Sequence, residues 1–375
     1  MDTKWMIRSI LFLGLVSSFS FPIQAQTAPP EVITLKYCEF QPFQDMKFSD
    51  HFWASPSRTA AVKKTLLEIE KRTGGRIRHN YSCDGSLARR MDLLSANKVG
   101  KCDLGGGPNV LFQPAQFPIW QCSQLMFLGM PTIWASFKAW NELAFSNFQI
   151  KEEFERQGMK FLGAYSYPSV LISKKPVSEP ENLRGMKINA MGQAAKWVVS
   201  LGGTVVPTIG YSVAEALRDR IIEGIVGYPY VLYKYHSQDH CKFLVRTPVS
   251  NSIIYCNWIN LDTWRKIPPD LQKIYEETWR EYYSREAIQY GRAEIARCEK
   301  AFKDAGVELF DLTRSQYGRW KASSAFLTNR YLAKMSRMGL NGNKIIGEFE
   351  ILYKKFITAG LILPLYRRSG IFPED

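Results

Sequence analysis

Short apolar runs alternate with helical patterns in the first half of the chain. The helix expected over residues 57–72 has Val62, Leu66 and Ile69 at helical spacing and ends before a pair of glycines. The elements predicted around it are a strand at 32–38, a strand at 76–81, a helix behind the N-cap candidate Ser86 and a strand that begins at 102. This βαβαβ order predicts a parallel sheet with short crossovers.

The second half repeats this alternation and adds one long helix. Its predicted elements are one or two strands at 160–173, a strand at 186–190, a helix at 193–201, a strand at 204–206, a helix at 212–218, and strands at 221–226 and 250–260. From Pro268 a helical pattern continues to about residue 303. We therefore expect two α/β lobes and a long late helix, and chains of this kind bind ligands in the crevice at the carboxyl ends of the strands.

The N-terminus has the features of a secretory signal peptide. Lys4 and Arg8 provide a positive start, residues 10–21 are apolar, and small and polar residues follow. We expect cleavage after Ala25 or Ala28, and export to a bacterial periplasm. The alternative is an uncleaved anchor, for which the apolar run is short.

The net charge is +14 over 375 residues, which admits nucleic acid, an anionic membrane or an anionic small ligand as partners. The lysines and arginines are scattered along the whole chain, with no basic run longer than a pair. This scatter argues against nucleic acid, and so does the expected export. The seven cysteines are an odd number, so at least one is unpaired within the chain, and no C-x-x-C motif supports a thioredoxin-like or zinc-ribbon fold.

Residue types that carry catalysis or bind metals form no recognisable motif. His236 and His240, with Cys241 beside them, have the spacing of metal ligands on one helical face, and the alternative is a solvated helix end. The glycines at 105–107 suggest a close backbone approach but lack the Gly-Lys-Ser/Thr of a phosphate loop. No G-x-S-x-G elbow occurs. We expect no enzymatic activity, no metal and no cofactor.

Several short motifs follow one another in a recognisable order over roughly residues 32–330. The segment 181–189, Glu-Asn-Leu-Arg-Gly-Met-Lys-Ile-Asn, is similar to a DLKGLKIR signature, and 216–224 is similar to ALQ-x-GVVDG. The other matching segments are 73–77 (TGGRI), 85–87 (G-x-LG), 102–104 (x-D-M), 117–127 (FPL…LPF) and 258–268 (a strand and the W-x-x-LP entry to a long helix). In this order, and behind a signal peptide, they resemble the solute-binding proteins of TRAP (tripartite ATP-independent) transporters, the DctP family.

The resemblance implies an α/β, two-lobed periplasmic-binding-protein-like fold of type II-like form, with hinge strands and a long helix in the C-terminal half. Such proteins close over one small solute and deliver it to the small and large membrane subunits of a permease. The expected boundaries are a signal peptide at 1–25, lobe I at 26–150 plus about 250–265, lobe II at 151–249, the long helix and closing helices at 266–340, and a C-terminal extension at 341–375. We expect a monomer or weak dimer.

The chain departs from the family pattern at the ligand site. The arginine that closes the KIR signature typically pairs with a ligand carboxylate, and here the position is Asn189. Lys175 stands at the second frequent ligand-contacting arginine, and Tyr228 and Tyr230 flank the position of a common asparagine. The candidate ligand-binding residues are Phe40, Lys175, Asn189, Tyr211, Tyr228, Tyr230 and Trp258.

Two forms of ligand are compatible with these residues. Either Lys175 or another basic residue neutralises a monoanion, or a neutral ligand is held by aromatic walls with Asn189 as a hydrogen-bonding partner. The basic balance of the chain favours a small organic acid bound in a non-standard way. The alternative functions are a periplasmic ligand-sensing protein of the same fold and an exported enzyme on an α/β scaffold. The extension past residue 341 is expected to be a docked helix or a partner surface.

Overall fold

The computed structural model describes residues 31–40, 56–83, 85–107, 112–208 and 212–360. From Val32 onward the chain belongs to one compact unit. The predicted signal peptide and Tyr211 lie outside the described residues. Within the described part of the chain, no helix is long and apolar enough to span a membrane.

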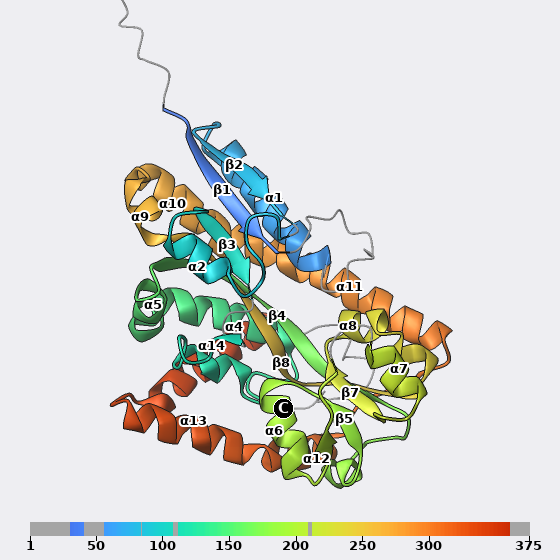
Figure 1. Cartoon of the computed structure of the whole chain (residues 1–375). Coiled ribbons are helices and arrows are strands. Elements are labelled where there is room, and N and C mark those ends of the chain that lie inside the picture. Colours follow the sequence, from blue (N-terminus) through green and yellow to red (C-terminus); the bar gives the residue numbers. More distant parts are fainter. Residues whose placement is uncertain (1–30, 41–55, 84, 108–111, 209–211, 361–375) are drawn as a thin grey trace, which may run out of the picture. The chain divides into compact units, whose positions relative to one another are not determined.

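The strands of the described residues form one nine-stranded sheet. They are β1 (Ile33–Glu39), β2 (Ile77–Ser82), β3 (Leu104–Gly107), β4 (Met159–Ser173), β5 (Lys187–Asn189), β6 (Thr204–Val205), β7 (Gly224–Gly227), β8 (Phe243–Asn260) and β9 (Glu308–Phe310). Their order is β2-β1-β3-β8-β4-β7-β5-β6, and β9 pairs with β8 (Figure 1).

The helices of the described residues lie between and after these strands. In the first half they are α1 (Pro56–Arg72), α2 (Leu93–Lys98), η1 (Trp120–Gln124), α4 (Ile133–Ser146), α5 (Phe148–Glu155), η2 (Pro180–Leu183), α6 (Gly192–Ser200), α7 (Ser212–Arg218), α8 (Pro229–Lys234) and η3 (Ser237–Asp239). In the second half they are α9 (Leu261–Lys266), α10 (Pro269–Glu277), the π-helical segment η4 (Thr278–Tyr283), α11 (Ser284–Asp304), α12 (Arg314–Ser323), α13 (Ala325–Arg337) and α14 (Gly342–Thr358).

The strand pairing confirms the predicted α/β class with two parallel groups. Strand β1 pairs in parallel with β2 and β3, and β5 pairs in parallel with β6 and β7. The two groups are joined by β4 and β8, which pair antiparallel to each other over nearly their whole length. In Figure 1 these long strands run side by side through the middle of the sheet.

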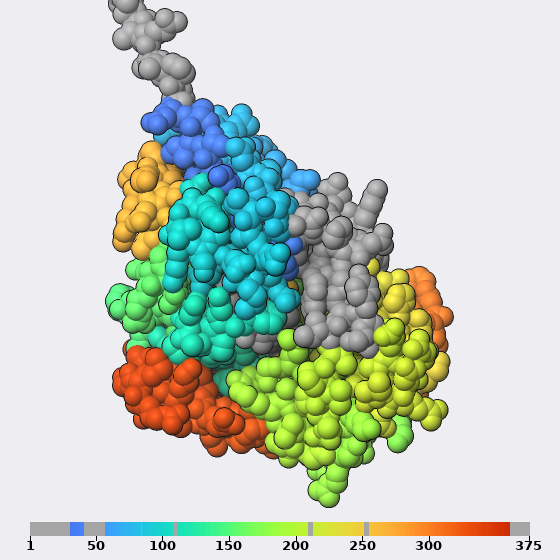
Figure 2. Space-filling model, viewed as in Figure 1, coloured from blue at the N-terminus to red at the C-terminus, as the bar shows by residue number. Residues whose placement is uncertain are grey.

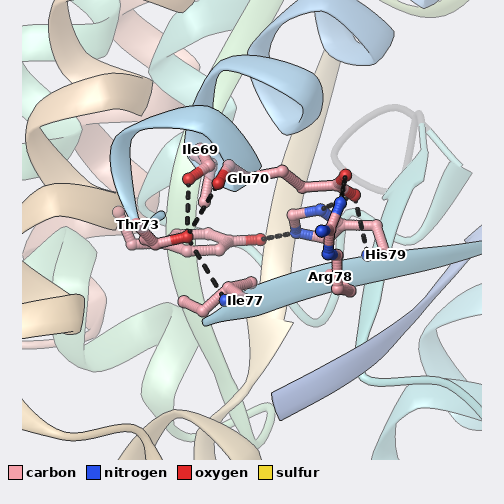
Figure 3. Close-up of polar contacts among 7 residues, drawn as sticks. Ile69, Glu70, Thr73, Ile77, Arg78 and His79 are labelled. Atoms are coloured by element: carbon pink, nitrogen blue, oxygen red, sulfur yellow. Dashed lines mark hydrogen bonds and ion pairs between the residues drawn. The ribbon is translucent and has the colours of Figure 1, made fainter. Parts of the chain in front are cut away.

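The TGGRI segment is a turn that ends α1 and begins β2. The Thr73 hydroxyl donates to the Ile69 carbonyl oxygen at 2.8 Å and accepts from the Ile77 backbone N–H at 3.2 Å. Gly74 and Gly75 follow with positive φ angles of 59° and 80°, which residues with a Cβ adopt at a cost. Figure 3 shows this turn next to His79, whose Nδ1 lies 3.1 Å from Oε1 of Glu70. The motif therefore has a structural role here.

Two predicted elements begin at least three residues later than expected. The helix expected behind Ser86 begins only at Leu93, because residues 85–92 form successive turns in which the Ser86 N–H donates to the Cys83 carbonyl. The strand expected from Ile221 begins at Gly224, because Arg220 has a positive φ of 58° and the chain is still turning there.

Helix α4 has no counterpart among the predictions, and β8 and the long late helix differ in part from what was predicted. Helix α4 is buried over most of its circumference, so its sequence shows no separate polar stripe from which a helical period can be read. Strand β8 begins at Phe243, seven residues before the predicted start. The prediction placed the start too late because Pro248 and several polar residues interrupt the apolar run. The long helical pattern after Pro268 is present, but the π-helical η4 lies inside it.

The described beginning of the C-terminal extension is a docked helix. Helix α14 packs on α4, where the Phe349 ring stacks on Trp140 with 3.7 Å between ring centroids. The Tyr353 hydroxyl accepts a hydrogen bond from the Thr132 N–H at 3.2 Å. All seven cysteines lie in the described part of the chain, where no disulfide bond joins any two of them.

Candidate functional site

A buried arginine at the start of α1 forms the centre of the candidate site. Arg58 is fully buried, and its Nη2 lies 2.8 Å from Oε2 of Glu39, which is equally buried at the end of β1. The Tyr37 hydroxyl donates to the same carboxylate oxygen at 3.1 Å. The guanidinium carbon of Arg58 lies 4.6 Å from the centre of the Tyr255 ring. A cation thus lies in the protein interior, in contact with the Glu39 carboxylate and the Tyr255 ring.

A row of tyrosines from β4, β8 and the start of α8 continues from this arginine. The ring centroid of Tyr167 lies 5.6 Å from that of Tyr255 and 4.7 Å from that of Tyr165. Tyr167 also stacks on Tyr228, with 4.4 Å between the two ring centroids. The Tyr165 hydroxyl is 2.8 Å from Oγ of Ser57, which ties the row back to α1. We call Tyr37, Glu39, Arg58, Tyr165, Tyr167, Tyr228 and Tyr255 the arginine–tyrosine cluster.

Gly106 in β3 allows the backbone to approach this cluster. A Cβ at this position would lie 2.6 Å from Oδ1 of Asn257, 3.1 Å from the Tyr37 hydroxyl and 3.3 Å from Nη1 of Arg58. The Asn257 amide donates to the Tyr283 hydroxyl at 3.3 Å, so the π-helical η4 also reaches the edge of the cluster. The predicted close backbone approach of the 105–107 glycines is thus to side chains of the protein itself.

Burial sets the protonation states of the cluster. Burial raises the pKa values of Tyr165, Tyr167 and Tyr228 well above their ordinary value, so their hydroxyls stay protonated and can donate hydrogen bonds. Burial by itself lowers the pKa of Arg58, but the Glu39 carboxylate and nearby tyrosines more than offset this, so the net shift is upward and Arg58 stays charged. Tyr167 and Tyr228 have no hydrogen-bond partner for their hydroxyls among the described residues.

Three of the predicted ligand-binding residues lie in or beside the cluster. Phe40 stacks on Tyr255 with 6.1 Å between ring centroids. Tyr228 belongs to the tyrosine row, and Tyr230 is buried close enough to raise the pKa of Tyr228 further. Tyr211 lies outside the described residues. The roles of all four in binding stay predictions.

The Asn189 side chain is hydrogen-bonded to the loop at residues 206–208. Its amide nitrogen donates to the Val206 carbonyl at 3.1 Å, and to the carbonyl and hydroxyl oxygens of Thr208 at 3.3 and 2.6 Å. Asn189 is 6% exposed at the end of β5. A ligand that accepted a hydrogen bond from this nitrogen would compete with these loop contacts.

The structure does not bring Lys175 or Trp258 into the cluster. The Lys175 side chain is 73% exposed, and its Nζ lies 3.7 Å from Oε1 of Glu223. Trp258 is adjacent in β8 to Asn257, and alternate residues of a strand point to opposite faces of the sheet. Its indole packs against Gly105. Arg58 is a basic residue of the cluster other than Lys175, an alternative that the sequence analysis left open, and the roles of Lys175, Asn189 and Trp258 in binding stay predictions.

Arg58, Tyr167 and Tyr255 were missed by the sequence analysis. A basic residue in the first turn of a helix, one position after Ser57, is the only local signal for Arg58, and it is also typical of an ordinary surface residue. The tyrosines lie in predicted strands, where aromatic residues are common for packing alone.

The histidine hypothesis for a metal is not supported by the geometry. His236 has a left-handed backbone with φ of 52° after α8, and His240 follows the short η3, so the two do not share one helical face. Among the described residues, no group of three or more His, Cys, Asp or Glu side chains has a metal-binding arrangement.

The fold resembles that of known periplasmic receptors. It is similar to a TRAP periplasmic solute-binding protein from Desulfovibrio salexigens, with a TM-score of 0.74 and 22% identity over 86% of this chain and 96% of that chain. It is also similar to a TRAP solute-binding protein from Rhodoferax ferrireducens in complex with copurified benzoate, with a TM-score of 0.70 and 18% identity over 88% and 100% of the two chains. The chain therefore has the two-lobed periplasmic-binding fold.

The sequence comparisons identify the family. The model of the family "Bacterial extracellular solute-binding protein, family 7" (DctP) matches residues 51–334, and the chain belongs to this family. It is also 22% identical over 325 residues to the "Uncharacterized protein YiiZ" of Salmonella typhimurium, which covers 81% of this chain and 88% of that protein. The family consists of extracytoplasmic receptors that bind small solutes and deliver them to membrane permease subunits, which confirms the predicted class of function.

Proposed function

We propose that this protein captures a small organic acid with one carboxylate and a planar ring, and delivers it to a TRAP permease. The acid binds at the arginine–tyrosine cluster when the two lobes close around it. The protein is exported with a cleaved signal peptide, acts as a monomer or weak dimer, and catalyses no reaction. As part of this proposal we keep the lobe boundaries that the sequence analysis expects.

The observation that carries this proposal is the buried guanidinium of Arg58. A buried arginine supplies the charged, forked donor group that carboxylates prefer. Its place on the Tyr255 ring, near the protonated hydroxyls of Tyr167 and Tyr228, supports recognition of an acid whose oxygens accept hydrogen bonds from phenols.

The charge balance of the cluster favours a monoanion over a dianion. The charge of Arg58 is already matched by Glu39, and Glu294 is a second buried carboxylate that accepts from the Ser57 N–H at 3.3 Å. A dicarboxylate would bring two further negative charges to this interior, where burying an uncompensated charge is costly. A single carboxylate on an otherwise apolar molecule carries the smaller penalty.

The aromatic walls support a flat, ring-bearing solute. Tyrosine faces stack favourably on planar groups, with rings 4.5 to 7 Å apart at about 0.5–1.5 kcal/mol per pair. Similar structures of the fold hold such acids: the Rhodoferax ferrireducens protein copurified with benzoate, and a marine metagenome protein of 17% identity was crystallised with 3-hydroxybenzoate. These ligands are the natural first probes.

Mass spectrometry of the small molecule that copurifies with the exported protein tests the proposal directly. A thermal-shift panel of benzoate, 3-hydroxybenzoate, pyroglutamate, malonate and succinate then ranks the chemical classes. We expect the ring-bearing monocarboxylates to raise the melting temperature most. A larger shift with succinate or malonate would contradict the proposed class of ligand.

Two substitutions place the binding event at the cluster. Tyr228→Phe removes a hydroxyl that has no partner among the described residues, so we expect unchanged folding and about five- to tenfold weaker binding of the acid. Arg58→Lys keeps the charge but removes the fork, and a loss of at least tenfold is expected. Lys175→Ala, at an exposed cation, is the control and should leave affinity unchanged. If Lys175→Ala weakened binding and Tyr228→Phe left the affinity unchanged, the result would place the binding site at Lys175 instead of the cluster.

A further inference from the structure

A hollow lies outside the arginine–tyrosine cluster, between α6, α13 and the segment 114–121 that leads into η1. Its volume is about 220 Å³. The residues that line it are Pro114, Gln121, Gln193, Lys196, Leu327, Arg330, Tyr331, Lys334 and Arg337. Figure 2 shows the orange-red α13 region next to the yellow-green region that contains α6.

Four of these residues are cations, and none of the lining residues is a carboxylate. Three of the cations, Arg330, Lys334 and Arg337, come from successive turns of α13, and Lys196 faces them from α6. Among the described residues, none of the four forms an ion pair. Burial and the charges of Arg330 and Lys334 lower the pKa of Lys196, as expected where cations crowd together.

The Glu153 carboxylate lies within electrostatic range of Lys334, but it is hydrogen-bonded elsewhere. Glu153 is 2% exposed, and its two oxygens accept from the backbone N–H groups of Ile119 at 2.6 Å and Trp120 at 2.9 Å. Burial raises its pKa to about 7, and the neighbouring charges of Arg156 and Lys334 only partly oppose this rise. Glu153 therefore does not neutralise the four cations.

We infer that this hollow is a second binding site, for a small oxyanion that carries two or more negative charges. The arginine and lysine side chains from α13 and α6 can each donate to a different oxygen, and the two glutamines, Gln121 and Gln193, are further polar groups at its wall. A multiply charged anion relieves the mutual repulsion of the four cations, whereas a monocarboxylate leaves most of it in place. The site thus differs in ligand class from the arginine–tyrosine cluster.

The placement of the hollow gives the anion a stabilising effect. Its lining comes from three segments far apart in sequence, 114–121, 193–196 and 327–337. An anion that contacts all three holds them together, and any ligand that binds the folded form alone raises its melting temperature. We therefore expect anion binding to stabilise the exported protein independently of its transported solute.

Isothermal titration calorimetry with inorganic pyrophosphate and inorganic phosphate, at an ionic strength held constant with sodium chloride, tests this inference. We expect saturable 1:1 binding, tighter for pyrophosphate. The double variant Arg330→Gln/Lys334→Gln should weaken it at least tenfold, and so should Lys196→Gln, which changes a different element. The control Lys344→Gln/Lys354→Gln removes the same charge from exposed positions of α14 and should bind like the unmodified protein.

Three outcomes would overturn the inference. One is the absence of saturable binding to the unmodified protein. Another is equal affinity in the Arg330→Gln/Lys334→Gln variant and its control, because the anion would then be responding to net charge. The third is binding of poly-glutamate without binding of either phosphate, which would make the hollow a docking surface for an acidic protein. Retained binding in Arg58→Lys separates this site from the solute site.

Discussion

At the scale of single residues, Gly106 is a position where the cluster tolerates little change. Any side chain there meets Asn257, Tyr37 and Arg58 at distances that require them to move. We expect Gly106→Ala to lower the free energy of unfolding by about 1–3 kcal/mol and to weaken solute binding, because the Arg58 head group must shift. Chemical denaturation and titration of the solute measure the two effects.

The matched control is Gly318→Ala in α12. A Cβ at Gly318 meets nothing within 4 Å, and alanine is the better helix former by roughly 0.5–1 kcal/mol. This variant should be equally stable or slightly more stable, with unchanged binding. Equal behaviour of the two variants would mean that the close approach at β3 has no energetic consequence.

His79 connects stability to pH. Its Nε2 lies 3.2 Å from the Tyr275 hydroxyl and its Nδ1 lies 3.1 Å from Oε1 of Glu70 (Figure 3). Burial lowers its pKa to about 4, although Glu70 opposes this shift. His79 therefore binds a proton below about pH 6.5 in the unfolded chain, but only below about pH 4 in the folded chain.

Stability should accordingly fall as the pH drops from 6.5 towards 4, with a contribution from His79 of up to about 1.4 kcal/mol per pH unit. We expect His79→Gln to flatten this part of the profile, measured by urea denaturation at half-unit pH steps. His236→Gln, at a 69% exposed side chain, should keep the slope of the unmodified protein. A slope unchanged by His79→Gln would assign the acid sensitivity to other groups.

At the scale of elements, α14 is an integral part of the fold. Phe349 is fully buried against Trp140, so Phe349→Ala should cost about 3–5 kcal/mol of stability. Ile351 lies on the same helix but is 69% exposed, and Ile351→Ala should change stability by less than about 0.5 kcal/mol. Thermal and chemical unfolding of both variants distinguish a docked helix from a loosely attached tail.

Element prediction succeeded where a local pattern existed and failed where burial removed it. Helix α1 shows three apolar residues at helical spacing and a glycine stop, and its predicted bounds are nearly those observed. Helix α4 has Trp134, Phe137 and Trp140 buried on several sides, so no polar face marks its period. The start of β8 was missed for a related reason, since its pairing with β4 compensates for a sequence that is locally ambiguous.

At the scale of the whole molecule, β4 and β8 are the expected hinge. They pair along their length and connect the parallel group around β1 with the parallel group around β5. We expect the copurified solute to reduce the radius of gyration measured by small-angle X-ray scattering, since closed and open forms differ by rotation about these strands. An unchanged radius at saturation would count against lobe closure. The Tyr228→Phe variant should need more solute for the same contraction.

The sequence by itself determined the class of this protein. Apolar periodicity, glycine stops and the order of short motifs are properties of neighbouring residues, so they were readable before any folding and predicted both the α/β architecture and the solute-binding family. The candidate site could not be predicted in this way, because residues far apart in the sequence form it. Ser57 and Glu294 meet across 237 residues, and Arg58 joins Tyr255 and Glu39 from three separate elements. Only the tertiary structure decided that Arg58 supplies the buried charge and that Lys175 lies in solvent, because burial and ion pairing depend on contacts that no local pattern encodes.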